Sequence, residues 1–116
     1  MEGTYHEKLK IKMDFYVHEV YRVTKNFPKH ELYGVTSQLR RASLSVILNY
    51  IEGFARNKCY DSKIYKNFLQ MSYGSLKESM YLLHFSLTEE YLDRDSYKIL
   101  IKSGDEIGAM LYKIIK

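Results

Sequence analysis

Residues 35–56 read VTSQLRRASLSVILNYIEGFAR, and this stretch decides the fold. Apolar and small residues recur along it at spacings of three and four, which is the period of an α-helix. They form two stripes, of which the first is Val35, Leu39, Ala42, Ser43, Val46, Tyr50 and Gly53. The second stripe consists of Leu44, Ile47, Leu48, Ile51 and Ala55. A helix that is apolar on two sides needs two partners, so we expect the second stripe to meet a buried neighbour or another subunit.

Helical periodicity continues on both sides of this stretch. It predicts three more helices, over about residues 5–26, over about residues 62–91, and from Asp93 or Asp95 to the last residues. Pro28 ends the first of them, and Asp61 or Ser62 is the expected cap of the next. Four helices with short connections, without an alternating strand pattern, indicate an all-α, antiparallel up-down-up-down bundle that forms one domain over residues 1–116.

Glycines inside the predicted helices indicate close packing. Gly74 lies in mid-helix, where glycine costs up to about 1 kcal/mol relative to alanine, so we expect another backbone to approach it closely. Gly104 and Gly108 lie four residues apart and are expected to form a smooth groove. Gly53 is expected to permit either a close subunit contact or a bend.

Net charge is unevenly distributed along the chain. The 116 residues carry 18 Lys and Arg against 14 Asp and Glu, a formal charge of +4. Residues 35–67 hold six of the basic residues and two of the acidic ones, so this third of the chain accounts for the whole excess. Such a local excess is typical of a surface that binds phosphate or an acidic partner, and an ordinary solvated face is the alternative.

The sequence carries no pattern typical of catalysis or of metal binding. Its four histidines form neither HExxH nor paired ExxH motifs, so we expect no metal site, no cofactor and no enzymatic activity; metal analysis is the direct test. Cys59 is the only cysteine, and we interpret it as a surface thiol. No segment has the roughly 18 apolar residues of a membrane helix, and the first twelve residues lack a signal-peptide core, so we expect a cytoplasmic protein.

Three groups of motifs carry a family resemblance. They are QLRRA at 38–42 followed by NYIEG at 49–53, FP at 27–28 followed by ELYG at 31–34, and YGSLKE at 73–78. In these motifs, over about residues 5–112, the chain resembles the small bacterial four-helix-bundle proteins first noted in ribosomal RNA intervening sequences. That family is similar in fold to the accessory variability determinant (Avd) proteins of diversity-generating retroelements. Residues 46–48, Val-Ile-Leu, stand where the intervening-sequence pattern usually has a small stretch with Pro or Ala, which favours the retroelement branch.

The resemblance implies a ring-shaped homo-oligomer, a pentamer of bundles, without enzymatic activity. Avd proteins present a basic surface that binds nucleic acid and associate with the reverse transcriptase of the element. The expected partners are therefore RNA or DNA, a reverse transcriptase that makes cDNA from an RNA template, and further copies of the chain. The alternatives are a protein-binding adaptor and an intervening-sequence-type bundle that has no reverse transcriptase partner.

The expected subunit contact is formed by Leu44, Ile47, Leu48 and Ile51. The basic candidates for contact with nucleic acid or reverse transcriptase are Arg22, Lys25, Lys29, Arg40, Arg41, Arg56, Lys58, Lys63 and Lys66. Arg40 and Arg41 point about 100° apart on a helix, so they cannot face one partner in the same way. One is expected to pair within the bundle or across subunits, for instance with Glu52 or Glu78, and the other to meet solvent or phosphate. Glu52 also precedes Arg56 by four residues, which predicts a surface ion pair.

Overall fold

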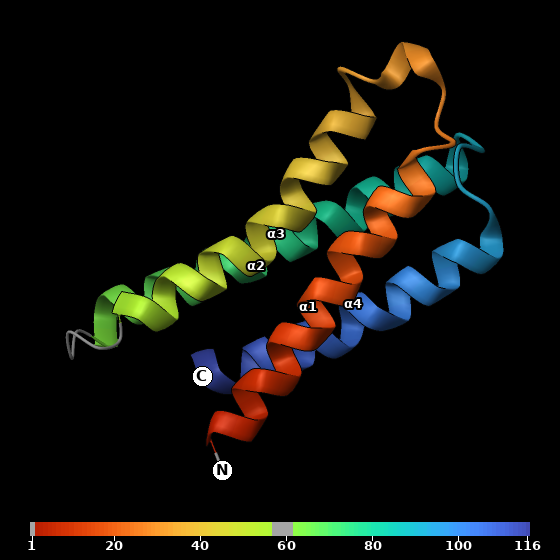
Figure 1. The fold of residues 1–116 in the computed structure, drawn as a ribbon. Coiled ribbons are helices and arrows are strands. Elements are labelled where there is room, and N and C mark those ends of the chain that lie inside the picture. Colours follow the sequence, from red (N-terminus) through yellow and green to blue (C-terminus); the bar gives the residue numbers. More distant parts are fainter. Residues whose placement is uncertain (1, 57–61) are drawn as a thin grey trace.

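The fold was obtained as a computed structural model, which describes residues 2–56 and 62–116. Within these ranges the chain forms four α-helices and one short 3₁₀ helix, and no strand. The elements are α1 (Glu2–Thr24), η1 (Lys29–Glu31), α2 (Val35–Arg56), α3 (Ser62–Thr88) and α4 (Arg94–Ile115). Each α-helix runs opposite to the one before it (Figure 1), which confirms the predicted all-α up-down-up-down bundle.

The four helices are not equally packed. The closest association is between α2 and α3, while α1 packs on α2 and α4, and α4 packs on α3. The hairpin formed by α2 and α3 extends past the free ends of α1 and α4 (Figure 1), and the molecule measures 45 × 25 × 19 Å. One end of α2 is therefore covered on fewer sides than the other.

The first stripe of α2 enters the core as predicted. Leu39, Val46 and Tyr50 are at most 1% exposed. A Cβ atom at Gly53 would lie 2.8 Å from Cβ of Phe68, so this glycine lets α2 approach α3 inside one subunit, and no bend is needed to explain it. Gly53 is predicted to permit a subunit contact or a bend, but in the structure it is buried and permits the close packing of α2 on α3.

The glycines of α3 and α4 behave differently from one another. A Cβ at Gly104 would lie 3.0 Å from the sulfur of Met80, and one at Gly108 would lie 3.4 Å from Leu76, so the predicted groove on α4 is confirmed. The prediction for Gly74 is wrong, because this residue is exposed and no described atom lies within 4 Å of its ideal Cβ position.

Two helices end earlier than the sequence predicts. α1 ends at Thr24, two residues before Asn26, in a turn whose amides bond to Val23 and Thr24. α3 ends at Thr88, three residues before Tyr91, because Glu90 adopts a φ of 66°. The Tyr91 amide then donates to the Ser86 carbonyl at 2.8 Å, and the Glu90 amide to Leu87 at 3.0 Å, which is a Schellman C-cap with glutamate in place of glycine.

The start of α4 is confirmed as predicted. The Asp93 carboxylate accepts a hydrogen bond from the Ser96 amide at 3.0 Å. Interaction with the Ser96 side chain, and after it this amide bond, lowers the pKa of Asp93. The predicted cap of α3 at Asp61 lies outside the described residues.

Candidate nucleic-acid interface

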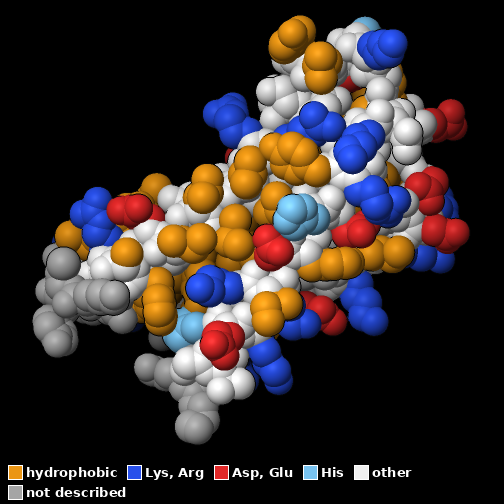
Figure 2. Space-filling model, viewed as in Figure 1, with side chains coloured by type: hydrophobic (Ala, Val, Ile, Leu, Met, Phe, Trp, Pro, Cys, Tyr) orange, Lys and Arg blue, Asp and Glu red, His pale blue; other side chains and the backbone are white. Residues whose placement is uncertain are grey.

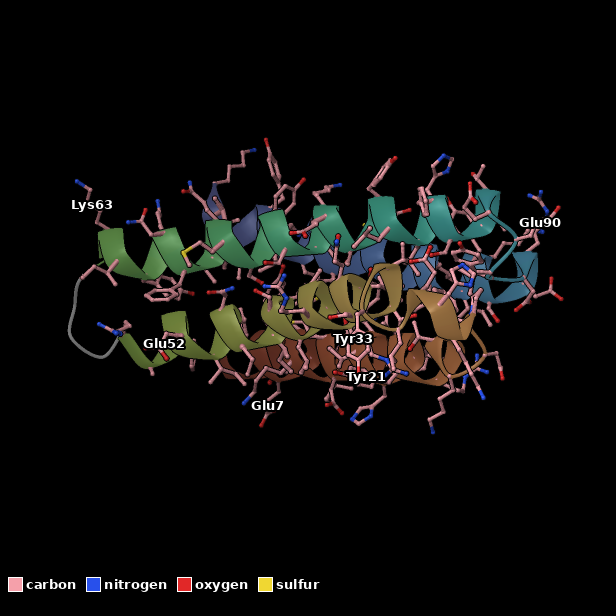
Figure 3. The ribbon with its side chains drawn as sticks, turned by 90° about the horizontal axis from the view of Figure 1, so that it is seen from above. Glu7, Tyr21, Tyr33, Glu52, Lys63 and Glu90 are labelled. Carbon is pink, nitrogen blue, oxygen red and sulfur yellow. The ribbon has the colours of Figure 1, made fainter. Side chains whose placement is uncertain are left out.

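The predicted basic residues divide between the two ends of the molecule. Arg22, Lys25, Lys29 and Arg40 belong to the end where α1 stops and α2 begins, whereas Arg56, Lys63 and Lys66 belong to the α2–α3 end. The 16-residue separation of Arg40 and Arg56 along α2 corresponds to about 24 Å. In Figure 3, Glu52 and Lys63 lie toward one end, well away from Tyr21, which contacts Arg40. Lys58 lies outside the described residues.

Arg40 is held against α1 at the start of α2. Its Nε donates a hydrogen bond to Oγ1 of Thr24 at 2.8 Å, and its guanidinium carbon lies 4.8 Å from the centroid of the Tyr21 ring. Arg41 is exposed. One arginine of the pair is thus packed and the other meets solvent, but within the described part of one subunit neither of them forms an ion pair with Glu52 or Glu78. Glu52 lies twelve residues along α2 from Arg40, about 18 Å away, which is too far to reach. A pairing across subunits stays a prediction.

Two of the predicted arginines are paired with a carboxylate of their own helix. Nη2 of Arg22 lies 2.8 Å from Oε1 of Glu19, and the hydrogen bond to this carboxylate raises the pKa of Arg22. Nε of Arg56 lies 2.9 Å from Oε2 of Glu52, which confirms the predicted ion pair. Both pairs lower the positive potential that these arginines present to phosphate, because a fixed negative charge lies beside each of them.

Three cations at the α1–α2 end have no carboxylate within ion-pair distance in the described part of the chain. These residues, Lys25, Lys29 and Arg40, are here called the connection cluster. All three line a single pocket of about 280 Å³, whose other lining includes Phe27 and Pro28. Side chains from α1, η1 and α2 meet in this pocket, so the connection between the first two helices determines its shape.

Glu31 is the carboxylate nearest to the connection cluster along the chain, and its oxygens are already occupied. Oε1 accepts a hydrogen bond from the Val35 amide at 3.2 Å, and Oε2 accepts one from Oη of Tyr91 at 2.9 Å. These two bonds, the amide bond first, lower the pKa of Glu31. A Cβ at Gly34 would lie 2.5 Å from Oε1, so glycine leaves room for the carboxylate at this position. The ELYG motif therefore fixes the start of α2.

The other predicted cations are solvent-exposed. Arg41, Lys63 and Lys66 have no ion pair among residues 2–56 and 62–116. In Figure 2, Lys and Arg side chains gather over the upper end of α1 and the α1–α2 connection. On the face drawn in Figure 2, the basic side chains are therefore densest around the α1–α2 connection. Arg56, Lys63 and Lys66 form a second group at the α2–α3 end.

The second stripe of α2 remains open within one subunit. Leu48 and Ile51 are 56% and 45% exposed, while Leu44 and Ile47 are half-buried. Ile11 on α1, which is 69% exposed, lines a surface hollow together with Ile47. Figure 2 shows the resulting band of hydrophobic side chains over α1 and α2. Ile11 is an apolar residue outside the core spacing of the first helix, and this position is the sequence signal by which its part in the band could have been predicted.

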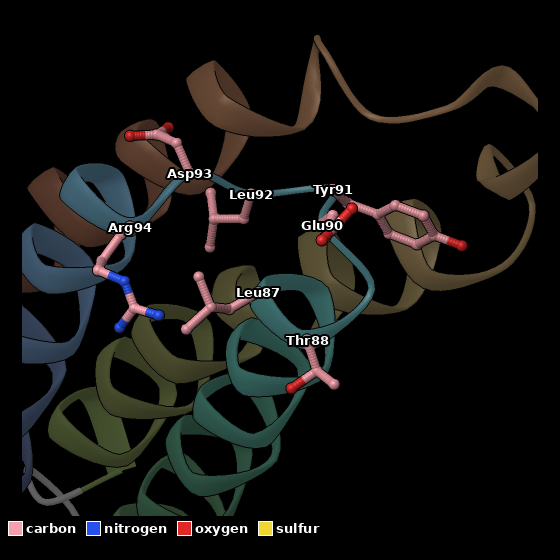
Figure 4. Close-up of a pocket in the computed structure, with 7 residues that line it drawn as sticks. All are labelled: Leu87, Thr88, Glu90, Tyr91, Leu92, Asp93 and Arg94. Carbon is pink, nitrogen blue, oxygen red and sulfur yellow. The ribbon is translucent and has the colours of Figure 1, made fainter.

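The described residues offer no arrangement typical of a catalytic or metal site. No group of three His, Cys, Asp or Glu side chains could hold a metal ion in that part of the chain. A pocket of about 720 Å³ lies at the α3–α4 connection (Figure 4), and its charged lining residues are Glu90, Asp93 and Arg94, without His or Cys. Within residues 2–56 and 62–116, no helix is long and apolar enough to cross a membrane. Cys59 lies outside those ranges.

Comparison with known proteins supports the fold and gives the family. A crystal structure of a protein of unknown function from the S23 ribosomal protein family of Bacteroides thetaiotaomicron superposes with a TM-score of 0.80. It is 22% identical, and the match covers 93% of this chain and 98% of that one. No curated protein matches significantly. The 23S rRNA-intervening sequence protein family matches residues 8–113, and the chain therefore belongs to that family.

Proposed function

We propose that this protein is a non-catalytic, oligomeric nucleic-acid-binding protein. The observation that carries the proposal is the connection cluster, where Lys25, Lys29 and Arg40 line one pocket with no carboxylate partner in the described chain. A cation without a nearby carboxylate presents its full positive potential to phosphate. Arginine in addition offers two-point hydrogen bonding to phosphate. The exposed Arg41, Lys63 and Lys66 would add weaker contacts along the backbone of a bound strand.

The open stripe on α2 supports assembly of several copies. Leu44, Ile47, Leu48 and Ile51 would be covered by another subunit, in a ring that we propose to be a pentamer. A ring would repeat the +4 charge of each chain around one axis. Several weak phosphate contacts would then act together, because linked sites raise the effective concentration of one another.

The partner within this proposal is a reverse transcriptase of a diversity-generating retroelement, which the protein would assist in RNA-templated cDNA synthesis. Support comes from the resemblance to Avd proteins, and from the apolar residues Val46, Ile47 and Leu48. An intervening-sequence bundle without a reverse transcriptase is the second candidate, and membership of that family favours it. Genes for a reverse transcriptase and for paired template and variable repeats beside this one would decide between the two.

Fluorescence anisotropy with labelled RNA and DNA duplexes tests the binding role. The double variant Lys25→Gln/Lys29→Gln should bind about tenfold more weakly than the parent, since it loses two phosphate contacts. The matched control, Lys98→Gln/Lys113→Gln, removes the same charge from exposed positions on α4 and should bind as the parent does. Equal losses in both variants, or no binding by the parent, would contradict the proposal.

Light scattering tests the assembly. The parent should have the mass of several 13.8 kDa chains, five for a pentamer, and Leu48→Ser/Ile51→Ser should dissociate it. Met71→Ser is the control, because Met71 is 51% exposed but lies on α3 and is not part of the α2 stripe. A monomeric parent would remove the ring. Capture of a partner protein from nuclease-treated material, with no nucleic-acid binding, would favour the adaptor instead.

A further inference from the structure

The pocket at the α1–α2 connection is small and combines cations with an apolar lining. Phe27, Pro28 and Leu32 form its apolar lining, and the charged groups come from the connection cluster. A volume of about 280 Å³ bounded by apolar side chains suits a small group that enters end-on. A phosphodiester within a strand carries a sugar on both sides, so it can contact the exposed Lys25 and Lys29 from outside but does not enter the pocket as a terminal phosphate can.

One residue that lines the same pocket has a buried hydroxyl without a partner. Thr36 is 2% exposed and lines the pocket, and its Oγ1 has no hydrogen-bond partner among the described residues. An unpaired buried hydroxyl costs free energy, and buried polar groups are nearly always satisfied. The neighbouring Thr24 is different, because its hydroxyl donates to the Val20 carbonyl at 2.8 Å and accepts from Arg40. The Thr36 hydroxyl is therefore an unused hydrogen-bond donor in a residue that lines the pocket, whose charged lining residues are all cations.

The start of α2 adds positive potential at this position. Thr36 is the second residue of a 22-residue helix, and the amino end of a helix carries a partial positive charge. The Glu31 carboxylate accepts hydrogen bonds from the Val35 amide and from Oη of Tyr91. The one acidic side chain of η1 is therefore paired with these two groups and not with the cations of the pocket. Lys25 and Lys29 belong to the segment that joins α1 to α2, and Arg40 is fixed by its bond to Thr24.

We propose that this pocket binds a phosphomonoester, meaning a terminal phosphate of a nucleic-acid strand or a free phosphate. The inference rests on the proposed nucleic-acid function and names the group that the pocket selects. A monoester carries a charge of about −1.5 to −2 near neutral pH, against −1 for each phosphodiester, and so is the better match for three cations. Its additional oxygen would accept the hydrogen bond that the Thr36 hydroxyl lacks.

The test compares single-stranded oligonucleotides of one sequence that carry a 5′-phosphate, a 3′-phosphate or hydroxyl groups at both ends. Anisotropy should show binding of one phosphorylated form that is tighter by about 10- to 100-fold, the range expected for one charge-assisted hydrogen bond. Thr36→Val should reduce this preference, because it removes the hydroxyl while the three cations of the pocket remain. Thr36→Ser, which keeps the hydroxyl, should retain the preference.

Inorganic phosphate, added to the parent in a calorimeter, distinguishes the source of the group. Binding of phosphate alone as tightly as the phosphorylated strand indicates a free anion as the ligand, whereas much weaker binding indicates a strand end; both results support the pocket. Equal affinity for all three oligonucleotides, with no binding of phosphate, would overturn the inference and leave the proposed function intact. Failure of every oligonucleotide to bind would instead overturn the proposed function, and tight binding of phosphate would still support the pocket.

Discussion

Nε of Arg40 donates a hydrogen bond to the hydroxyl of Thr24 at 2.8 Å, across the junction of α2 with the end of α1. The hydroxyl in turn donates to the Val20 carbonyl at 2.8 Å. The bond uses Nε and leaves the two terminal nitrogens of the guanidinium for other partners. Thr24 is 3% exposed, so a buried residue of α1 sets the direction of a cation that lines the pocket.

Thr24→Val should therefore affect both stability and binding. The loss of one buried hydrogen bond is expected to cost about 1 kcal/mol in the free energy of unfolding. Nucleic-acid affinity should fall as well, because Arg40 would no longer be held toward the pocket. Urea denaturation and anisotropy measure the two effects, with Thr24→Ser as the control that keeps the hydroxyl. Parent-like stability and affinity in Thr24→Val would show that this bond does not position Arg40.

Gly74 and Gly53 should respond to alanine in opposite directions. Gly74 is exposed inside α3 with open space around it, so Gly74→Ala should raise the free energy of unfolding by about 1 kcal/mol. Gly53→Ala should lower it by about 1–3 kcal/mol, because the new Cβ would lie 2.8 Å from Cβ of Phe68. Thermal denaturation at one protein concentration compares them. Destabilisation by Gly74→Ala with loss of oligomer mass would instead place a second subunit over this face.

Glu90 is a strained position that substitution should relieve. Its φ of 66° is costly for any residue with a Cβ and is readily adopted by glycine. Glu90→Gly should raise the free energy of unfolding by about 1 kcal/mol, measured in urea. Glu90→Ala removes the same charge but keeps a Cβ, so it should give no comparable gain. Equal stabilisation by both variants would assign the effect to charge rather than to the backbone.

The capping of α2 by Glu31 should make stability depend on pH. Hydrogen bonds from Val35 and Tyr91 lower the pKa of Glu31 from its ordinary value of 4.5, so the folded state favours the carboxylate. This contribution is present above pH 4.5 and is lost as the pH falls through the lowered pKa of the folded state. Urea denaturation of the parent and of Glu31→Gln from pH 7 downward should give curves that converge in acid. A constant difference between them at every pH would contradict this role.

The sequence predicts the helices well because periodicity and local end signals specify them. The second helix was predicted to start near Leu32–Val35 and to run to about Arg56, and it is observed over Val35–Arg56; Asp93 identified the start of the last. The end of α3 at Thr88 was missed because glutamate is an unusual residue for the left-handed position that Glu90 occupies. Gly74 was misinterpreted because spacing alone does not show whether a neighbouring helix reaches a residue.

The candidate site was only partly predictable. Composition correctly placed an excess of charge in residues 35–67, but the fold separates Arg40 from Arg56 and brings Arg40 to Lys25 and Lys29 instead. This neighbourhood depends on the turn after α1, which residue spacing does not determine. Thr36 was not identified as a site residue, because nothing in the sequence indicates that its hydroxyl would be buried without a partner.

The salt dependence of duplex binding tests the central claim most directly. Affinity measured from about 50 to about 200 mM salt should fall steeply, and the slope of log K against log salt should become shallower by about 0.9 for each phosphate contact removed. Lys25→Gln/Lys29→Gln is predicted to flatten the slope by about two such steps, and Lys98→Gln/Lys113→Gln to leave it unchanged. An affinity that is independent of salt, or equal slopes in all three proteins, would contradict phosphate binding by the connection cluster.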